Sequence, residues 1–119
     1  MRNNFYTSQI MKLAIVGSRG INNIDIGTYI QEVPTEIISG GAKGVDTLAA
    51  EYAIRNNIKL TEFLPDYKRY GRGAPIIRNS QIVESCDKLI AFWDGKSRGT
   101  LSSINLAKKL GKELQVVII

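Results

Sequence analysis

The sequence contains no histidine, and Cys86 is its only cysteine. Without an imidazole, serine–histidine and cysteine–histidine catalysis are excluded in this chain, together with the common histidine metal sites. A single cysteine forms no disulfide within the chain and cannot build a cysteine zinc cluster. Any chemistry must therefore use carboxylates, hydroxyls, lysines or the backbone, and we expect no metal centre.

Long apolar runs are also missing from the sequence. No run approaches the ~20 residues that a membrane-spanning helix needs, and no signal peptide with a basic start and an apolar middle is visible. We therefore expect a cytoplasmic protein without a membrane partner. The chain has 119 residues, of which 44% are apolar and 23% are charged. This composition is typical of one globular domain that buries a single core.

Short apolar segments recur along the chain and are rich in residues that favour strands. There are five of them: Leu13 to Val16, Glu36 to Ile38, Leu60 to Leu64, Lys88 to Trp93 and Leu114 to Ile119. The segments between them show helical spacing, which predicts helices over 45–53, 74–86 and 100–110 and a weaker one over 24–32 that Pro34 stops. Strands that alternate with helices predict an α/β fold, a single-domain Rossmann-like three-layer sandwich with a five-stranded, mainly parallel sheet.

Two of the predicted helices have a clear apolar face. In the helix over 45–53 the face consists of Val45, Leu48, Ala49, Tyr52 and Ala53. In the helix over 100–110 we expect the sheet-facing side to consist of Leu101, Ile104, Ala107 and Leu110. Gly111 follows as a C-terminal stop.

In sheets of this kind, ligands bind outside the carboxyl ends of the strands. The segments that follow four predicted strands, 17–20, 40–44, 66–73 and 94–99, combine glycine with basic residues. These basic residues are Arg19, Lys43, Lys68, Arg69, Arg72, Lys96 and Arg98. With a net charge of +5, this edge is expected to attract anions. The alternative is that basic residues simply collect in solvated loops.

The segment 39–50 has the pattern of a phosphate site. Gly40, Gly41 and Gly44 surround Lys43 between an apolar run and an amphipathic helix. A helix start offers unpaired N–H groups and the positive end of the dipole, and glycine lets a ligand approach the backbone. Asp46 is placed either to cap this helix or to reach a ribose hydroxyl. The alternative is that the glycines serve ordinary turns.

Similar features follow the first and fourth strands. Gly17 and Ser18 come directly after one strand, and Gly99 and Thr100 open the last helix. The two hydroxyls are expected to contact a phosphate, or else to cap a helix. Trp93 ends its strand and is a secondary candidate for stacking on a base, although a tryptophan on a strand more often packs in the core.

Four segments taken in order resemble one known family. They are 13–19 (LAIVGSR), 38–46 (ISGGAKGVD), 73–79 (GAPIIRN) and 96–100 (KSRGT). Together they are similar to the SLOG superfamily, in its branch related to YspA and cpYpsA. The resemblance covers Met11 to Ile119 and leaves 1–10 as an N-terminal extension, which we expect to be disordered. It implies a Rossmann-like domain that binds a nucleotide or a nucleotide-derived ligand, for sensing or for processing.

The motifs and the resemblance together define a set of expected ligand-binding residues, in which Arg78 and Asn79 rest on the resemblance alone. The set is Gly17, Ser18, Arg19, Gly40, Gly41, Lys43, Gly44, Asp46, Arg78, Asn79, Asp94, Ser97, Arg98, Gly99 and Thr100. No cofactor is expected to be obligatory, although a nucleotide can bring Mg²⁺ with it. The resemblance also implies a homo-oligomer.

Two relatives of this family imply other functions. The lysine-decarboxylase-like phosphoribohydrolases cleave the N-glycosidic bond of a nucleoside monophosphate with a glutamate three residues after a glycine-threonine pair. Ser103 stands at that position here, so the carboxylate that would act on an oxocarbenium-like transition state is missing. Asp46 or Glu84 would have to replace it from another segment, and the sequence does not position them.

The second relative is DNA-processing protein A, which binds single-stranded DNA and carries a motif similar to 39–46. The segment 67–73, with sequence YKRYGRG, interleaves aromatic and cationic side chains, as suits stacking on bases and contact with phosphates. The same segment is equally interpreted as a lid with glycine hinges or as a surface turn.

Overall fold

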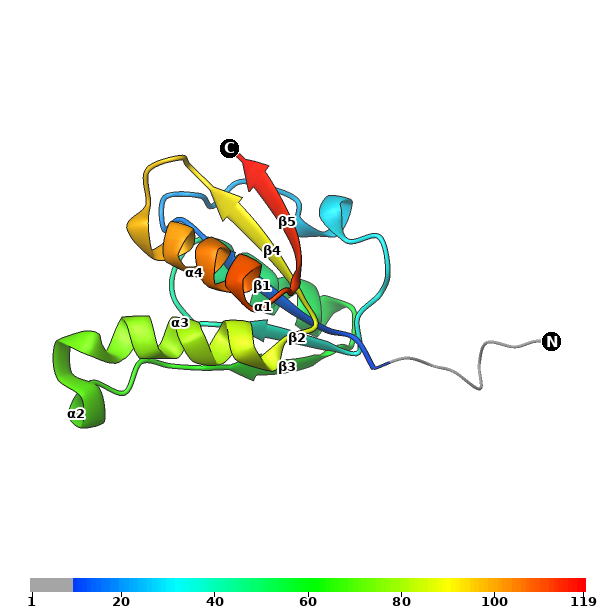
Figure 1. Ribbon diagram of the computed structural model, residues 1–119. Helices are drawn as coiled ribbons and strands as arrows, with labels where there is room; N and C mark the ends of the chain where they lie inside the picture. Colours follow the sequence, from blue (N-terminus) through cyan, green and yellow to red (C-terminus); the bar gives the residue numbers. More distant parts are fainter. Residues whose placement is uncertain (1–9) are drawn as a thin grey trace.

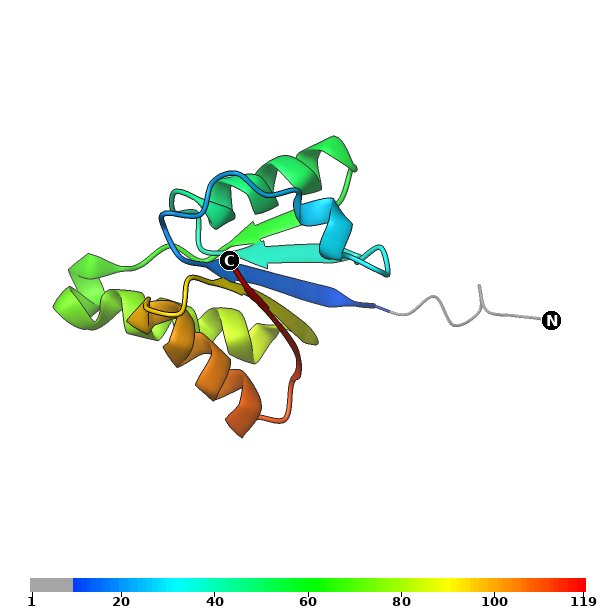
Figure 2. The ribbon, with the colours of Figure 1, turned by 90° about the horizontal axis from the view of Figure 1, so that it is seen from above.

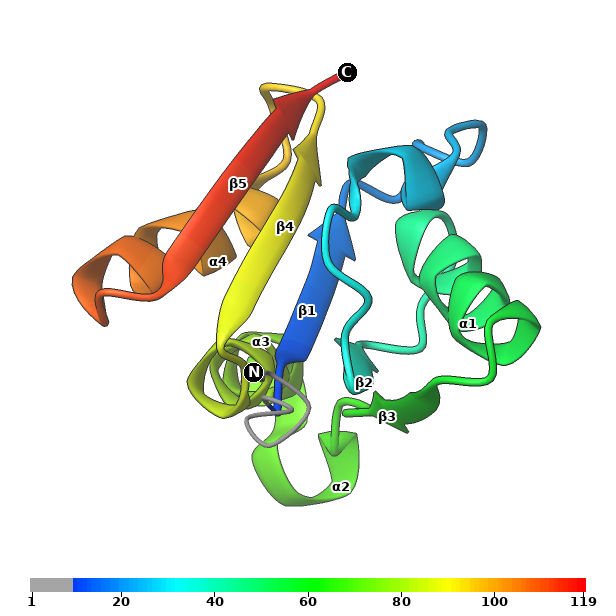
Figure 3. The same ribbon diagram turned by 90° about the vertical axis from the view of Figure 1, so that its right-hand side faces the viewer.

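A computed structural model describes residues 10–119 (Figure 1). Most of the predicted extension therefore lies outside the described residues. The sheet has five parallel strands in the order β3-β2-β1-β4-β5. Their bounds are β1 (Lys12–Gly17), β2 (Glu36–Ser39), β3 (Lys59–Glu62), β4 (Lys88–Trp93) and β5 (Glu113–Ile118). The predicted Rossmann-like sandwich is confirmed, and Figure 3 shows β5, β4 and β1 side by side.

Helices cover both faces of the sheet. Helix α1 (Val45–Arg55) packs on β1, β2 and β3, whereas α3 (Ala74–Ser85) and α4 (Arg98–Lys109) lie on the opposite face (Figure 2). A short 3-10 helix, η2 (Ile26–Tyr29), contacts α1. Among the described residues, no helix combines the length and the apolar character needed to cross a bilayer.

The core lies in two clusters, one on each face of the sheet. Leu13 and Ile15 of β1 point to the α1 side, and Ala14 and Val16 point to the side of α3 and α4. This alternation is the period of two that a strand imposes, and β1 buries both of its faces because helices cover the sheet on both sides. In α1 the predicted apolar face is confirmed, with Leu48 half-buried and the other four residues buried.

The buried face of α4 differs from the prediction. Leu101 and Leu110 are 37% and 45% exposed, so the expectation that they face the sheet is wrong. The buried residues of the helix are Thr100, Ser103, Ile104 and Ala107. The buried face of α4 thus begins at Thr100 and not at Leu101, because two small polar residues, Thr100 and Ser103, occupy the buried side of its first turns. Gly111 has φ +69° just after the helix, which confirms it as the stop.

Two further segments differ from the prediction. The expected helix over 24–32 is only the single turn η2, where Asp25 accepts a hydrogen bond from the Gly27 N–H and Ile30 is already extended. Glycine within the turn disfavours a longer helix. The segment predicted as a loop over 67–73 is helical, with α2 (Tyr67–Tyr70) followed by η3 (Gly71–Gly73). Asp66 starts α2 by accepting a hydrogen bond from the Arg69 N–H at 3.1 Å.

Candidate functional site

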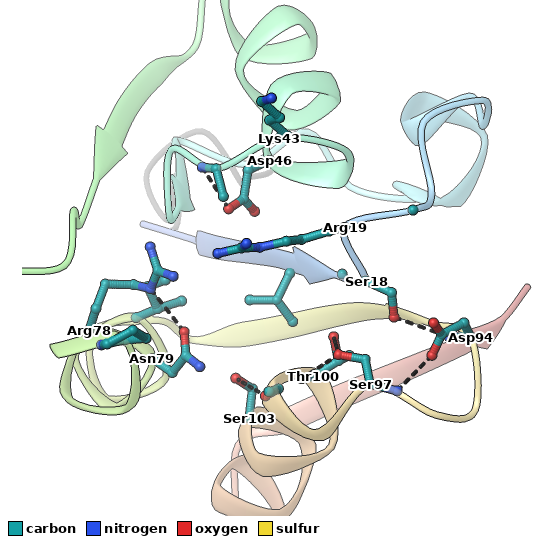
Figure 4. A pocket seen from close by; sticks show the side chains of 17 residues that line it. Ser18, Arg19, Lys43, Asp46, Arg78, Asn79, Asp94, Ser97, Thr100 and Ser103 are labelled. Carbon is teal, nitrogen blue, oxygen red and sulfur yellow. Dashed lines mark hydrogen bonds between the residues drawn. The ribbon is translucent and has the colours of Figure 1, made fainter. Parts of the chain in front are cut away.

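A cavity of about 440 Å³ opens at the carboxyl edge of the sheet (Figure 4). Its walls come from the segments after β1, β2 and β4 and from the first turns of α3 and α4. Most of the expected ligand-binding residues line it: Gly17, Ser18, Arg19, Lys43, Asp46, Arg78, Asn79, Asp94, Ser97, Gly99 and Thr100. The remaining lining residues are Val16, Gly20, Ala42, Pro75, Ile82 and Ser103. Segments far apart in the sequence thus meet at one edge of the sheet.

Four expected residues do not belong to the lining of the cavity: Gly40, Gly41, Gly44 and Arg98. The loop glycines instead let other groups come close. A Cβ on Gly40 would lie 2.7 Å from Nη1 of Arg78 and 2.9 Å from Oδ2 of Asp46. A Cβ on Gly44, which has φ +80°, would lie 2.6 Å from the Arg19 carbonyl oxygen. These glycines therefore permit the packing that forms the cavity wall.

Arg78 is the buried cation of the site. Its side chain comes from α3, and the residue is only 9% exposed. Nη1 donates to the Gly40 carbonyl oxygen at 2.7 Å and to the Phe63 carbonyl oxygen at 3.3 Å, and Nε donates to Oδ1 of Asn79 at 2.9 Å. No carboxylate of residues 10–119 forms an ion pair with it. The guanidinium therefore ties together the ends of β2 and β3 without a direct ion pair, and its charge acts on the nearby Asp46 carboxyl at longer range.

Asp46 lies on the same wall, in the first turn of α1. Its Oδ2 accepts a hydrogen bond from the Ala42 N–H at 3.1 Å, so the carboxylate closes the loop that precedes the helix. Burial raises the pKa of this carboxyl, and the hydrogen bond from Ala42 and the charge of Arg78 partly offset that rise. The cavity thus holds a carboxylate that sequence spacing alone could not position.

The opposite wall is built from hydroxyls and a second carboxylate. Asp94 Oδ1 accepts hydrogen bonds from the N–H groups of Lys96 and Ser97, each at 2.8 Å, and its own N–H donates to the Ser18 hydroxyl at 3.2 Å. The Ser97 hydroxyl caps α4 by accepting from the Thr100 N–H at 3.4 Å. The hydrogen bonds from Ser97 and Lys96 lower the pKa of Asp94.

Asp46 and Asp94 are expected to change the stability of the fold in opposite directions as the pH rises. Because the pKa of Asp46 is raised in the folded protein, stability falls as the pH rises from the ordinary value of 3.8 through the raised pKa. The pKa of Asp94 is lowered, so its stabilisation is present above 3.8 and is lost as the pH falls through the lowered pKa. We therefore expect Asp46→Asn to preserve or raise the Tm near neutral pH and Asp94→Asn to lower it.

This prediction is checked by thermal unfolding of the two variants over a pH series from acid to neutral. The difference between Asp94→Asn and the parent protein should shrink in acid, where Asp94 itself becomes protonated. Parallel Tm curves for the parent and both variants would contradict the assignment.

The other lining residues have weaker signals in the sequence. Ser103 lies one turn after Gly99 and Thr100 on the same face of α4, and its hydroxyl donates to the Gly99 carbonyl oxygen at 3.3 Å. Helical spacing from Thr100 could have identified it. Because Ser103 stands where the phosphoribohydrolase resemblance expects a glutamate, the cavity has no carboxylate at that point.

Several basic or aromatic candidates lie outside the lining. Lys68, Arg69 and Arg72 belong to α2 and η3, and none of them lines the cavity. Trp93 also stays out of the lining, since its indole N–H donates to the Ser97 carbonyl oxygen at 3.0 Å and its ring packs on the core. Across residues 10–119, no group of three or more cysteine, aspartate or glutamate side chains is placed to hold a metal ion.

One comparison with known proteins gives a match, and it covers the first half of the chain. Residues 11–70 match the model of the YspA, cpYpsA-related SLOG family. This match includes the segments 13–19 and 38–46, whereas the segments 73–79 and 96–100 follow it in the chain. No curated protein and no solved structure gives a significant match.

Proposed function

Since the chain belongs to the YspA, cpYpsA-related SLOG family, we propose that its carboxyl-edge cavity binds a phosphorylated, nucleotide-derived ligand, for sensing or for processing. The ligand's phosphate lies among Arg78, Arg19 and Lys43. Its hydroxyls lie toward Asp46 and the hydroxyl-bearing residues of α4.

The buried guanidinium of Arg78 is the observation that carries this proposal. Taking a cation out of water costs several kcal/mol unless an anion or further hydrogen bonds offset the loss. Carbonyl oxygens and one amide oxygen supply part of this compensation, but no described carboxylate pairs with the charge. A phosphate oxygen in the cavity would complete it, because arginine forms strong hydrogen bonds with phosphate.

The surroundings of Arg78 support an anion. Arg19 and Lys43 are exposed cations that line the same cavity, and Figure 4 shows the Arg19 side chain extending between the Asp46 wall and the Thr100 wall. The N-terminus of α1 follows Gly44, which provides no side-chain cap. Its N–H groups and dipole add to the positive potential at this edge.

The proposal predicts that the two exposed cations contribute to affinity without supporting the fold. We expect Arg19→Gln and Lys43→Gln each to weaken binding of AMP or ADP-ribose by about tenfold, since a charge-assisted hydrogen bond contributes ~1.5 kcal/mol or more. Isothermal titration calorimetry at constant ionic strength measures the change, and thermal unfolding checks that the apoprotein is unaffected.

Arg55→Gln is the matched control, because Arg55 is an exposed cation in the last turn of the same helix α1, away from the cavity. It removes one positive charge and should leave the affinity within about twofold of the parent protein, since exposed charges beyond a Debye length are screened. Equal losses in all three variants would mean that net charge, rather than the cavity, governs binding. If none of the nucleotides tested binds, the proposed function is wrong.

A second candidate, binding of single-stranded nucleic acid, is favoured by one observation. The short helices α2 and η3 carry Lys68, Arg69 and Arg72 outside the cavity, with Tyr67 57% exposed and the Arg69 guanidinium 5.1 Å from the Tyr70 ring centroid. Aromatic and cationic side chains of this kind bind bases and phosphates. Oligonucleotide binding that falls steeply with salt and is lost in Lys68→Glu, while mononucleotides do not bind, would favour this function instead.

A further inference from the structure

The lining of the cavity contains no aromatic side chain. Among residues 10–119, every tyrosine, phenylalanine and tryptophan lies elsewhere. Tyr52 and Phe92 are buried in the core, Tyr29 packs edge-on against Phe92 with ring centroids 5.2 Å apart, and the indole N–H of Trp93 is bonded to the Ser97 carbonyl. Ligand sites that hold a flat ring are usually rich in aromatic and apolar surface. This cavity offers a base no ring on which to stack.

The cavity instead presents groups that match a sugar phosphate. Arg19, Lys43 and Arg78 supply cations, and Asp46 supplies a carboxylate that accepts from hydroxyl groups. The hydroxyls of Thr100 and Ser103 lie on the opposite wall, as Figure 4 shows. These donors and acceptors surround a volume suited to a small polar molecule.

Thr100 places a buried hydroxyl at the cavity. The residue is 5% exposed, and its Oγ1 accepts a hydrogen bond from the Ser97 hydroxyl at 3.2 Å. A hydroxyl offers one donor and two acceptor positions, so the bond with Ser97 uses only part of the hydrogen-bonding capacity of Thr100. Thr100 lines the cavity, where its remaining capacity can serve a phosphate or sugar oxygen of a ligand.

We propose that the cavity recognises the ribose phosphate of its ligand and leaves the base outside, so that binding is nearly indifferent to the identity of the base. This inference rests on the proposed function and names the part of the ligand that the site selects. Affinity then comes from charge-assisted and hydroxyl hydrogen bonds, and the base contributes little because stacking requires a ring that the lining lacks.

Competition calorimetry with defined probes tests the inference. Ribose 5-phosphate is expected to bind within about tenfold of AMP, since it keeps all the groups that the cavity contacts, and AMP, GMP, CMP and UMP should agree within about threefold. Adenosine, which keeps the base and the ribose but lacks the phosphate, should bind at least about a hundredfold more weakly than AMP, as expected for the loss of charge-assisted bonds.

A variant separates recognition of the sugar phosphate from general damage. Thr100→Val removes the hydroxyl at nearly constant volume and should weaken ribose 5-phosphate and AMP by the same factor, about tenfold. Thr61→Val is the control, because Thr61 bonds to Glu36 in the β2–β3 pair and does not line the cavity. It should leave both affinities unchanged.

The outcomes distinguish the two proposals. Tight binding of AMP with ribose 5-phosphate about a hundredfold weaker, or a preference of about thirtyfold for one base, would overturn the inference and leave the proposed function standing. Failure of AMP, ADP-ribose and ribose 5-phosphate alike to bind would overturn both.

Discussion

Gly44→Ala is expected to lower the free energy of unfolding by about 3 to 4 kcal/mol, the range of a strained backbone combined with a steric clash. Gly44 has φ +80° and ψ −126°, a conformation that side chains rarely adopt. Its added Cβ would lie 2.6 Å from the Arg19 carbonyl oxygen and 3.0 Å from the Ile21 carbonyl oxygen. These neighbours are backbone atoms of the segment after β1, so relief requires one loop to move away from the other.

Gly95→Ala separates the effect of the backbone conformation from the effect of the steric clash. Gly95 also has φ +80°, but no atom lies within 4 Å of the position of an added Cβ. In Gly95→Ala the free energy of unfolding should therefore fall by only about 1 kcal/mol, the cost of the backbone conformation alone. Urea unfolding of both variants measures the difference, and equal losses would show that the close approach of the two loops does not matter for stability.

The comparison of Gly44→Ala with Gly95→Ala bears on the role of the glycines in residues 39–50 of this chain. Gly44 belongs to the motif that predicted phosphate binding, yet it lies behind the surface of the cavity. We expect its first role to be the packing of the segment after β2 against the segment after β1. Loss of ligand binding in Gly44→Ala would thus report a displaced cavity wall, and would not by itself identify a ligand contact.

The strands could be predicted from the sequence because their signal is local. A parallel strand buried on both faces is a short apolar run, and such runs identified β1, β2 and β4 closely. The face of α4 could not be predicted in this way. Apolarity favoured Leu101 and Leu110, whereas the structure buries Thr100 and Ser103 because they border a polar cavity. The prediction assumed that the apolar residues of a helix form its buried face, and this assumption fails where the helix borders a polar cavity.

The site could be predicted to the level of segments, since topology places the carboxyl ends of parallel strands at one edge. Individual roles required three-dimensional contacts. Nothing in the local sequence distinguished Arg78 from a surface cation, and only the family resemblance selected it. The structure buries Arg78 and leaves Glu84 exposed, because the Arg78 side chain reaches the carbonyl oxygens of Gly40 and Phe63 that follow β2 and β3.

Arg78→Met is expected to separate binding from folding. The methionine keeps an unbranched apolar stem in the buried space and removes the charge, so the phosphate loses its buried partner. We expect affinity for AMP to fall by a hundredfold or more, which corresponds to about 2.7 kcal/mol. Calorimetry on the parent protein and the variant gives this ratio.

Arg78→Met should change the free energy of unfolding less than it changes the free energy of binding, because two effects of burying Arg78 oppose each other. The variant leaves the Gly40 and Phe63 carbonyl oxygens without their donor, which costs about 1 to 3 kcal/mol. It also removes a buried charge that forms no direct ion pair with a described carboxylate, and relief from the cost of burying that charge favours the folded state. The two effects oppose each other, so the free energy of unfolding in urea should fall by less than ~2 kcal/mol.

Arg78→Lys completes the comparison, since it restores a positive charge without the planar guanidinium, whose Nη1 donates to two carbonyl oxygens while Nε donates to Asn79. It should recover part of the lost affinity, because the ammonium still attracts phosphate. If Arg78→Met retained the parent affinity while losing stability, the guanidinium would serve only to tie α3 to the loops after β2 and β3. If both variants lost affinity with little change in stability, the buried cation would be the ligand's partner, and the cost of its burial would be explained by what it binds.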